Sequence, residues 1–112
     1  MDKHKVAIVI PAFNEQDTIY GEVQSVKDNG IVIVVNDASI DDTEKRALKA
    51  GAIVVNHKVN KGYDGALNSG FIKATELDCD IIITFDADGQ HDPHLIKKFI
   101  MLLNSDYDVV IG

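Results

Sequence analysis

The fold is decided by residues 6–15, which read VAIVIPAFNE. Five apolar residues are followed by Pro11, Ala12 and Phe13 and then by the polar residues Asn14 and Glu15. A continuous apolar run lacks the alternation of a half-exposed strand, so it predicts a strand of a parallel sheet that helices cover on both faces. The polar residues after it then lie at the carboxyl end of the strand, where ligands of such sheets bind.

The same kind of apolar run recurs four more times along the chain. These further runs are residues 31–35, 52–55, 81–85 and 109–111. Helical patterns separate them, and right-handed crossovers between neighbouring parallel strands build a doubly wound sheet. We therefore expect an α/β fold of Rossmann-like type, with a mainly parallel sheet and helices on both faces.

Start and stop signals predict four helices. The first begins at Asn14 as N-cap, the second begins within residues 39–43 and ends at Gly51, the third covers 63–77, and the fourth runs from Asp92 to Leu103. We expect Gly70 to let the third helix approach the sheet closely.

The chain of 112 residues has the length and composition of one soluble globular domain, covering residues 1–112. It ends one residue past the last apolar run, so we expect a domain truncated at its C-terminus. The net charge of −7 disfavours nucleic acid as a partner. A phosphate ligand would therefore need help from a divalent cation.

No apolar run is long enough to cross a bilayer, and residues 1–5 lack a signal peptide, so the sequence predicts a cytoplasmic protein. We interpret Cys79 as a small buried hydrophobe and the four histidines as surface residues.

The polar residues after the first run fit two interpretations. Pro11 and Asn14 suit the end of a strand and a helix cap, which leaves Phe13 and Glu15 unexplained. An aromatic ring and a carboxylate at the crevice would suit a planar base. The glycine fingerprint of dinucleotide-binding folds is missing, which argues against a dehydrogenase.

Asp37 follows the second run, where its carboxylate would accept a hydrogen bond from a ring N–H of uracil or guanine. The alternative is a plain helix cap, for which Ser39 is suited. In the segment 60–66, Lys61 would offset the charge of a diphosphate, although a solvated surface lysine is the alternative.

Asp86 and Asp88 follow the fourth run and would repel each other unless a cation lies between them. Together with Gln90 they offer the oxygen ligands that Mg²⁺ prefers. The alternative is a solvated acidic turn before the Asp92 helix start.

Taken together, these motifs resemble family 2 glycosyltransferases with the GT-A fold, closest to the dolichol-phosphate mannosyltransferase and polyprenyl-phosphate glycosyltransferase branch. The motifs that carry the resemblance are Pro11-Ala12-Phe13-Asn14-Glu15, Asn36-Asp37-Ala38-Ser39, the segment 60–70 and Asp86-Ala87-Asp88-Gly89-Gln90-His91-Asp92-Pro93.

The resemblance implies a site for a UDP- or GDP-linked sugar. Its implied nucleotide-sugar-binding residues are Pro11, Ala12, Phe13, Glu15, Val35, Asp37, Lys61, Asp86, Ala87 and Asp88, with Asp86, Asp88 and Gln90 around Mg²⁺ or Mn²⁺. It further implies an inverting transfer to a lipid phosphate or a glycan, as in cell-envelope polysaccharide or glycolipid synthesis. The general base is expected beyond Gly112, and membrane association through segments absent from this chain.

The sequence leaves the donor base, the sugar, the acceptor and the oligomeric state open. Asn36 stands where the family usually has an aspartate. Two alternative functions are a haloacid-dehalogenase-type phosphatase, whose opening motif is also Asp-x-Asp-Gly, and a non-catalytic nucleotide-binding α/β module. The residues after Asp88 in this sequence are too few to supply the later motifs that the phosphatase family requires. Donor turnover would distinguish an enzyme from a binding module.

Overall fold

The computed structural model describes residues 5–84, 99–102 and 109–111 of the 112-residue chain. The elements are β1 (Val6–Ala12), α1 (Ile19–Val26), a 3₁₀ turn η1 (Lys27–Asn29), β2 (Ile31–Asp37), α2 (Thr43–Ala50), β3 (Ile53–His57), α3 (Gly62–Glu76), β4 (Ile81–Thr84), β5 (Phe99–Leu102) and β6 (Val109–Ile111). The predicted alternation of strands and helices is thus confirmed from β1 to β4.

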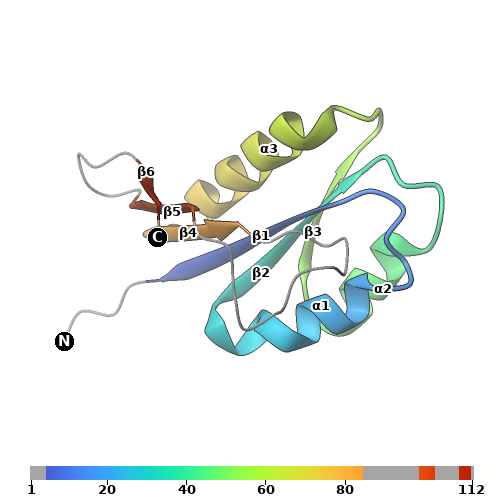
Figure 1. The fold of residues 1–112 in the computed structure, drawn as a ribbon, viewed down its shortest axis with the longest axis horizontal. Helices are drawn as coiled ribbons and strands as arrows, with labels where there is room; N and C mark the ends of the chain where they lie inside the picture. The colour runs from blue at the N-terminus through green and yellow to red at the C-terminus, as the bar shows by residue number, and fades with distance from the viewer. Residues whose placement is uncertain (1–4, 85–98, 103–108, 112) are drawn as a thin grey trace.

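All six strands form one sheet in the order β3-β2-β1-β4-β5-β6 (Figure 1). The pairs β1–β2, β1–β4 and β2–β3 are parallel, and β5 and β6 continue the sheet in antiparallel pairing. The chain reverses its direction of travel across the sheet between β3 and β4, beside β1. The carboxyl end of β1 therefore lies at the switch point where doubly wound sheets bind ligands, and the carboxyl end of β2 lies beside it.

Helices cover both faces of the sheet, as expected (Figure 1). One face packs on α1 and α2, and the other packs on α3. The α1/α2 core contains Ile8, Ile10, Ala12, Ile19, Val23, Val26, Val32, Val34, Ala47, Ala50 and Ala52. The α3 core contains Ala7, Val9, Ile33, Val35, Ala66, Ala74, Cys79 and Ile82, which confirms Cys79 as a buried hydrophobe.

Gly70 confirms the predicted close approach of α3 to the sheet. A Cβ atom placed on this glycine would lie 2.3 Å from Cγ1 of Val9 and 3.3 Å from Cγ2 of Val35. Contacts of this kind are repulsive, so any larger residue would push α3 away from β1 and β2.

The first helix begins later than predicted. Asn14 has φ 53°, outside the helical region, and α1 starts at Ile19 after a turn in which the N–H groups of Thr18 and Ile19 both donate to the carbonyl of Glu15. Asn14 is therefore wrong as an N-cap, because its side chain is used between loops instead. The end of α2 is as predicted, with Gly51 at φ 102°.

The fourth predicted helix is wrong in its second half. Phe99–Leu102 forms β5, which pairs antiparallel with β4, while residues 92–98 lie outside the described residues. Four consecutive apolar residues suit a strand as well as a helix, and periodicity cannot separate the two over so short a run.

Candidate functional site

A hollow of about 220 Å³ opens at the carboxyl ends of β1 and β2, beside the start of α3. It is lined by Pro11, Ala12, Phe13, Glu15, Asp37, Asn60, Gly62, Tyr63 and Ala66. Three chain segments that are distant in sequence meet here because the parallel strands end at one edge of the sheet. The hollow lies where the fold predicts a ligand crevice.

The loops after β1 and β2 are hydrogen-bonded to each other at this edge. The backbone N–H of Asn14 donates to Oγ of Ser39 at 2.8 Å, and Oδ1 of Asn14 accepts from the N–H of Ile40 at 2.9 Å. The N–H of Glu15 donates to Oγ1 of the buried Thr43 at 2.8 Å. These contacts fix the first loop against the start of α2.

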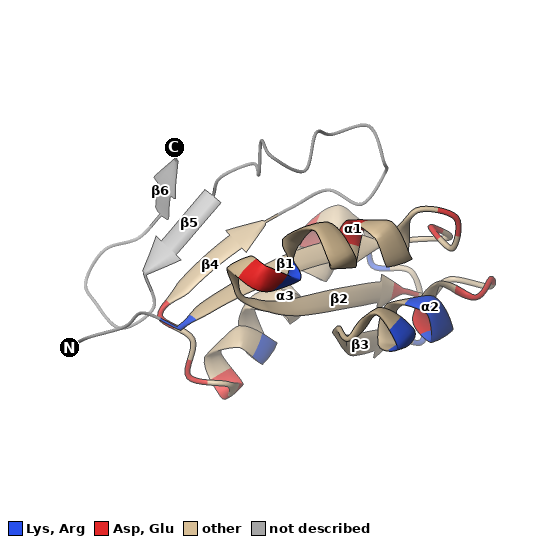
Figure 2. Ribbon diagram, turned by 90° about the horizontal axis from the view of Figure 1, so that it is seen from below, with Lys and Arg blue, Asp and Glu red and all other residues tan. Residues whose placement is uncertain are grey.

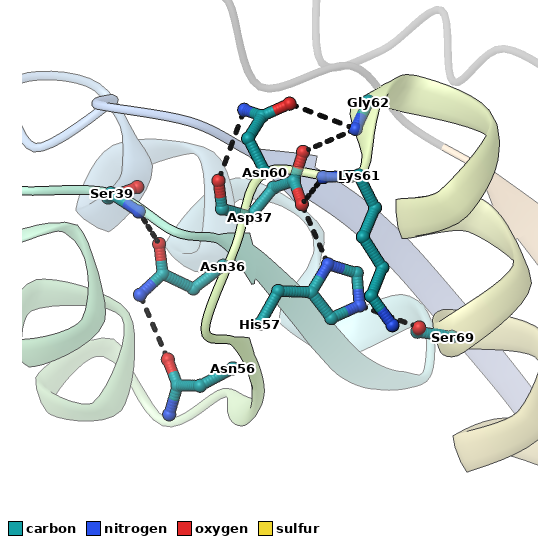
Figure 3. A network of polar contacts seen from close by, with 9 residues as sticks. All are labelled: Asn36, Asp37, Ser39, Asn56, His57, Asn60, Lys61, Gly62 and Ser69. Carbon is teal, nitrogen blue, oxygen red and sulfur yellow. Dashed lines mark hydrogen bonds and ion pairs between the residues drawn. The ribbon is translucent and has the colours of Figure 1, made fainter.

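Asp37 is the charged residue at the centre of the site, and it is only 4% exposed (Figure 3). Its Oδ1 accepts from the N–H of Lys61 at 2.8 Å, and its Oδ2 accepts from the N–H of Gly62 at 2.9 Å. Lys61 directly precedes α3 and Gly62 is its first residue, so both donors lie at the positive end of the helix, which favours an anion. Asp37 therefore caps α3 from the end of β2.

Hydrogen bonding keeps Asp37 ionised despite its burial. Desolvation raises the pKa of this carboxyl, but donors from the His57 side chain and from the N–H groups of Lys61 and Gly62 outweigh it, so the pKa lies below its usual value. An ionised carboxylate only accepts hydrogen bonds, and its two oxygens offer about four lone-pair positions. The site thus presents an acceptor to any ligand that reaches Asp37.

His57 was predicted to be a surface residue, and this prediction is wrong. Its side chain is only 5% exposed, with Nδ1 at 2.7 Å from Oδ1 of Asp37 and Nε2 at 2.7 Å from Oγ of Ser69 (Figure 3). His57 ends β3 as the register partner of Asp37, which places the two side chains together. The available sequence signal was that His57 comes just after the end of the apolar run 52–55, close to the edge where the ligand crevice was expected. His4, His91 and His94 lie outside the described residues.

Two exposed aromatic residues reach the hollow from different elements. Phe13, from the loop after β1, is 48% exposed, and Tyr63, from the first turn of α3, is 54% exposed. Aromatic side chains offer flat faces and edges on which another ring can pack. They make the hollow suited to a flat, partly apolar group beside the Asp37 acceptor.

The predicted site residues divide into three groups. Pro11, Ala12, Phe13, Glu15 and Asp37 come together in the lining of the hollow. Val35 lies fully buried in the α3 core, and Lys61 is exposed, with its backbone rather than its side chain bonded to Asp37. Asp86, Ala87, Asp88 and Gln90 lie outside the described residues.

Asn60, Gly62, Tyr63 and Ala66 line the hollow but were not predicted as site residues. From the segment 60–66 that contains them, the sequence analysis predicted a ligand contact for Lys61 alone. The aromatic ring that follows Gly62 was the signal for the rest.

Within the residues that the structure describes, no group of three or more His, Cys, Asp or Glu side chains could hold a metal ion. The predicted ligands follow β4 in the chain and fall in the undescribed segment. β4 ends at Thr84, the register partner of Val9, so β4 and β1 run to the same edge.

Two other hollows lie elsewhere. One of about 370 Å³ is lined by Val54, Val55, Ser69, Ile72, Lys73 and Glu76, and one of about 420 Å³ by Tyr20, Asp42, Lys45, Arg46 and Lys49. Both are larger than the hollow at the strand ends but lie along the sides of helices. The second hollow is lined partly by basic residues of α2, and Figure 2 shows the basic residues of this helix in blue.

No helix of the described part of the chain is long and apolar enough to span a membrane.

Comparison with known families decides what kind of protein carries this edge of the sheet. The profile of the family described as "Glycosyl transferase family 2" matches residues 7–112, nearly the whole chain. The chain belongs to glycosyl transferase family 2. As a family 2 glycosyltransferase it has the expected α/β fold of GT-A type.

Curated relatives extend beyond this chain. A protein of Methanocaldococcus jannaschii named "Uncharacterized protein MJ1222" is 41% identical over all of this chain and 47% of its own length. UDP-N-acetylglucosamine–dolichyl-phosphate N-acetylglucosaminyltransferase of Methanococcus voltae is 35% identical over 96% of this chain and 51% of its own. The family 2 chain thus spans about half the length of these relatives.

A solved structure agrees with the fold. Glucosyl-3-phosphoglycerate synthase from Mycobacterium tuberculosis, in complex with Mn²⁺, UDP and phosphoglyceric acid, superimposes with a TM-score of 0.64 at 31% identity. The match covers 80% of this chain and 35% of that chain. The same enzyme has also been crystallised with Mg²⁺ and UDP.

Proposed function

We propose that this chain forms the donor-binding half of a metal-dependent, inverting glycosyltransferase. Its donor is a UDP- or GDP-linked sugar, and its acceptor is a lipid phosphate or a glycan. The observation that carries the proposal is the hollow at the carboxyl ends of β1 and β2, where Phe13 and Tyr63 accompany the ionised Asp37.

The dimensions of the hollow suit one part of such a donor. Pockets that enclose whole drug-sized ligands measure roughly 300–1,000 Å³. A hollow of about 220 Å³ holds a base and part of its ribose. The diphosphate and the sugar then extend towards the residues that follow β4.

Each described residue has a definite task in this proposal. Phe13 and Tyr63 contact the faces or edges of the base, and Asp37 accepts its ring N–H. Uracil and guanine carry such an N–H, whereas the corresponding ring nitrogen of cytosine or adenine only accepts. Binding these groups fixes the donor for attack at its anomeric carbon, a gain from orientation alone.

Asp86, Asp88 and Gln90 would hold Mg²⁺ or Mn²⁺, because their oxygen atoms are the ligand type that hard cations take. A bound cation supplies charge neutralisation of the leaving nucleoside diphosphate. In a chain of net charge −7, this would offset the repulsion between protein and diphosphate. A solved complex of a similar protein with UDP and Mn²⁺ supports the use of a divalent cation.

The family membership favours this function over the haloacid-dehalogenase-type phosphatase and the non-catalytic nucleotide-binding module. Names of relatives, including a dolichol-phosphate mannosyltransferase of Pyrococcus furiosus, support a lipid phosphate as acceptor. A cytoplasmic location remains part of the proposal.

Calorimetric titration with UDP, GDP, CDP and ADP, each with and without Mn²⁺, tests the donor site. We expect Mn²⁺-dependent binding of UDP or GDP and no comparable binding of CDP or ADP. Tyr63→Ala should weaken binding about tenfold, the effect of losing about 1.4 kcal/mol of base contact. Tyr20→Ala, which removes another exposed tyrosine, is the matched control.

The cation is tested separately with Asp88→Asn, for which Asp28→Asn at an exposed position is the control. Asp88→Asn should abolish the Mn²⁺ dependence, and Asp28→Asn should preserve it. If all four nucleotides bind equally, or if none binds, the proposal of a base-selective site is ruled out.

A further inference from the structure

His57 joins the edge of the donor hollow to the middle of α3. Its ring lies between the Asp37 carboxylate and the Ser69 hydroxyl, at 2.7 Å from each (Figure 3). Its side chain is only 5% exposed, and His57 does not itself line the hollow, whereas its partner Asp37 does. It acts on a ligand only through Asp37.

The direction of these hydrogen bonds follows from the chemistry of the partners. The ionised Asp37 carboxylate can only accept, so Nδ1 of His57 carries a hydrogen. In the neutral ring Nε2 then accepts from the Ser69 hydroxyl. In the charged ring Nε2 donates to the same oxygen, because a hydroxyl can reverse its role.

These contacts occupy three of the roughly four acceptor positions of the Asp37 carboxylate. Oδ1 receives two donors, from His57 and from the N–H of Lys61, while Oδ2 receives one, from Gly62. Two donors on Oδ1 prevent the carboxylate from rotating, so the remaining acceptor capacity is concentrated on Oδ2. Asp37 contributes to the lining of the hollow, where a base would use that capacity.

We propose that His57 is a positioning residue of the donor site, which holds the Asp37 carboxylate through Nδ1 in the orientation that accepts the N–H of the base. The inference rests on the proposed nucleotide site. It assigns the function to one ring nitrogen: Nδ1 serves the ligand, and the Nε2–Ser69 contact anchors the ring to α3.

Two amide variants separate the two nitrogens. Asparagine carries its amide nitrogen two bonds from Cβ, like Nδ1, and glutamine carries it three bonds from Cβ, like Nε2. His57→Asn therefore keeps the donor to Asp37 and loses the contact with Ser69. His57→Gln keeps a group near Ser69 and loses the donor to Asp37.

The experiment is calorimetric titration of each variant with UDP and GDP in the presence of Mn²⁺. We expect His57→Asn to bind within about threefold of the parent, and His57→Gln to bind at least about tenfold more weakly, the usual effect of losing a hydrogen bond to a charged group. Ser69→Ala should resemble His57→Asn.

Thermal unfolding of all three variants shows whether each is folded at the titration temperature. In the parent, the ¹⁵N shifts of the His57 ring give an independent readout, with hydrogen expected on Nδ1. Equal affinities of His57→Asn and His57→Gln, or an unprotonated Nδ1, would overturn the inference while leaving the nucleotide site intact. A parent that binds neither nucleotide would overturn the proposed function, and the inference with it.

Discussion

Asn36 and Asn56 are register partners on neighbouring parallel strands, and Nδ2 of Asn36 donates to Oδ1 of Asn56 at 2.9 Å (Figure 3). Nδ2 of Asn56 in turn donates to Oε2 of Glu44 at 2.8 Å. The Glu44 carboxylate can only accept a hydrogen bond, so Asn56 must turn its amide nitrogen towards Glu44. The side-chain oxygen of Asn56 then faces residue 36. Residue 36 must therefore donate, which the amide of Asn36 does and an ionised aspartate could not.

Asn36→Asp should destabilise the protein by about 1–2 kcal/mol, because a 7%-exposed carboxylate would face an oxygen of Asn56. Urea unfolding measures the loss. Adding Glu44→Gln should recover part of it, since a glutamine donor lets Asn56 reverse its amide. A double-mutant cycle without coupling between positions 36 and 44 would contradict this relay of hydrogen bonds.

Gly70→Ala should lower the free energy of unfolding by about 1–3 kcal/mol, because its Cβ would overlap Val9. Gly21→Ala is the matched control, since a Cβ there has no atom within 4 Å. Gly21 lies in α1, so Gly21→Ala should raise the free energy of unfolding by about 0.5–1 kcal/mol through the higher helix propensity of alanine. Chemical denaturation compares the two, and equal effects would argue against close packing at Gly70.

Ala38→Gly should raise the free energy of unfolding by up to about 1 kcal/mol. Ala38 has φ 67°, in the left-handed region that costs a residue with a side chain roughly 1–2 kcal/mol. Glycine removes that strain, although its flexible unfolded state offsets part of the gain. Ala47→Gly, inside α2, provides the contrast and should destabilise. If thermal unfolding shows that both Ala38→Gly and Ala47→Gly lower the stability, the prediction of strain at Ala38 is contradicted.

Acid should unfold the protein partly through Asp37, whose pKa is lowered in the folded state. A lowered folded-state pKa contributes stability that is complete above the unfolded-state pKa of about 3.9 and is lost as the pH falls through the folded-state value. Unfolding free energies measured from pH 7 down to pH 2 should therefore decline below about pH 4. Asp37→Asn should flatten that decline; an unchanged slope would rule out Asp37 as a contributor.

The sequence predicted β1 to β4, β6, α3 and the end of α2 because apolar runs and glycine stops are local signals. It missed the start of α1 because Asn14 bonds to Ser39 and Ile40, and a contact between two loops is not local. The strand Phe99–Leu102 was missed because its pairing with β4 decides its conformation.

The candidate site shows the same division. Phe13 and Asp37 were predicted from the ends of apolar runs and lie in the hollow. His57 and Tyr63 were missed, since their importance depends on the β2–β3 register and on where α3 begins. The ligand-binding roles of Phe13, Asp37 and the residues after Thr84 are all still predictions.

The hydrogen bonds between the loops after β1 and β2 also bear on how binding would proceed. Asn14, Glu15 and Ile40 already have their backbone N–H groups bonded in the free protein. The entropy of ordering these loops is therefore lost during folding rather than on association. Their amide hydrogens should exchange slowly with deuterium before any nucleotide is added, and a ligand should find this side of its site preorganised.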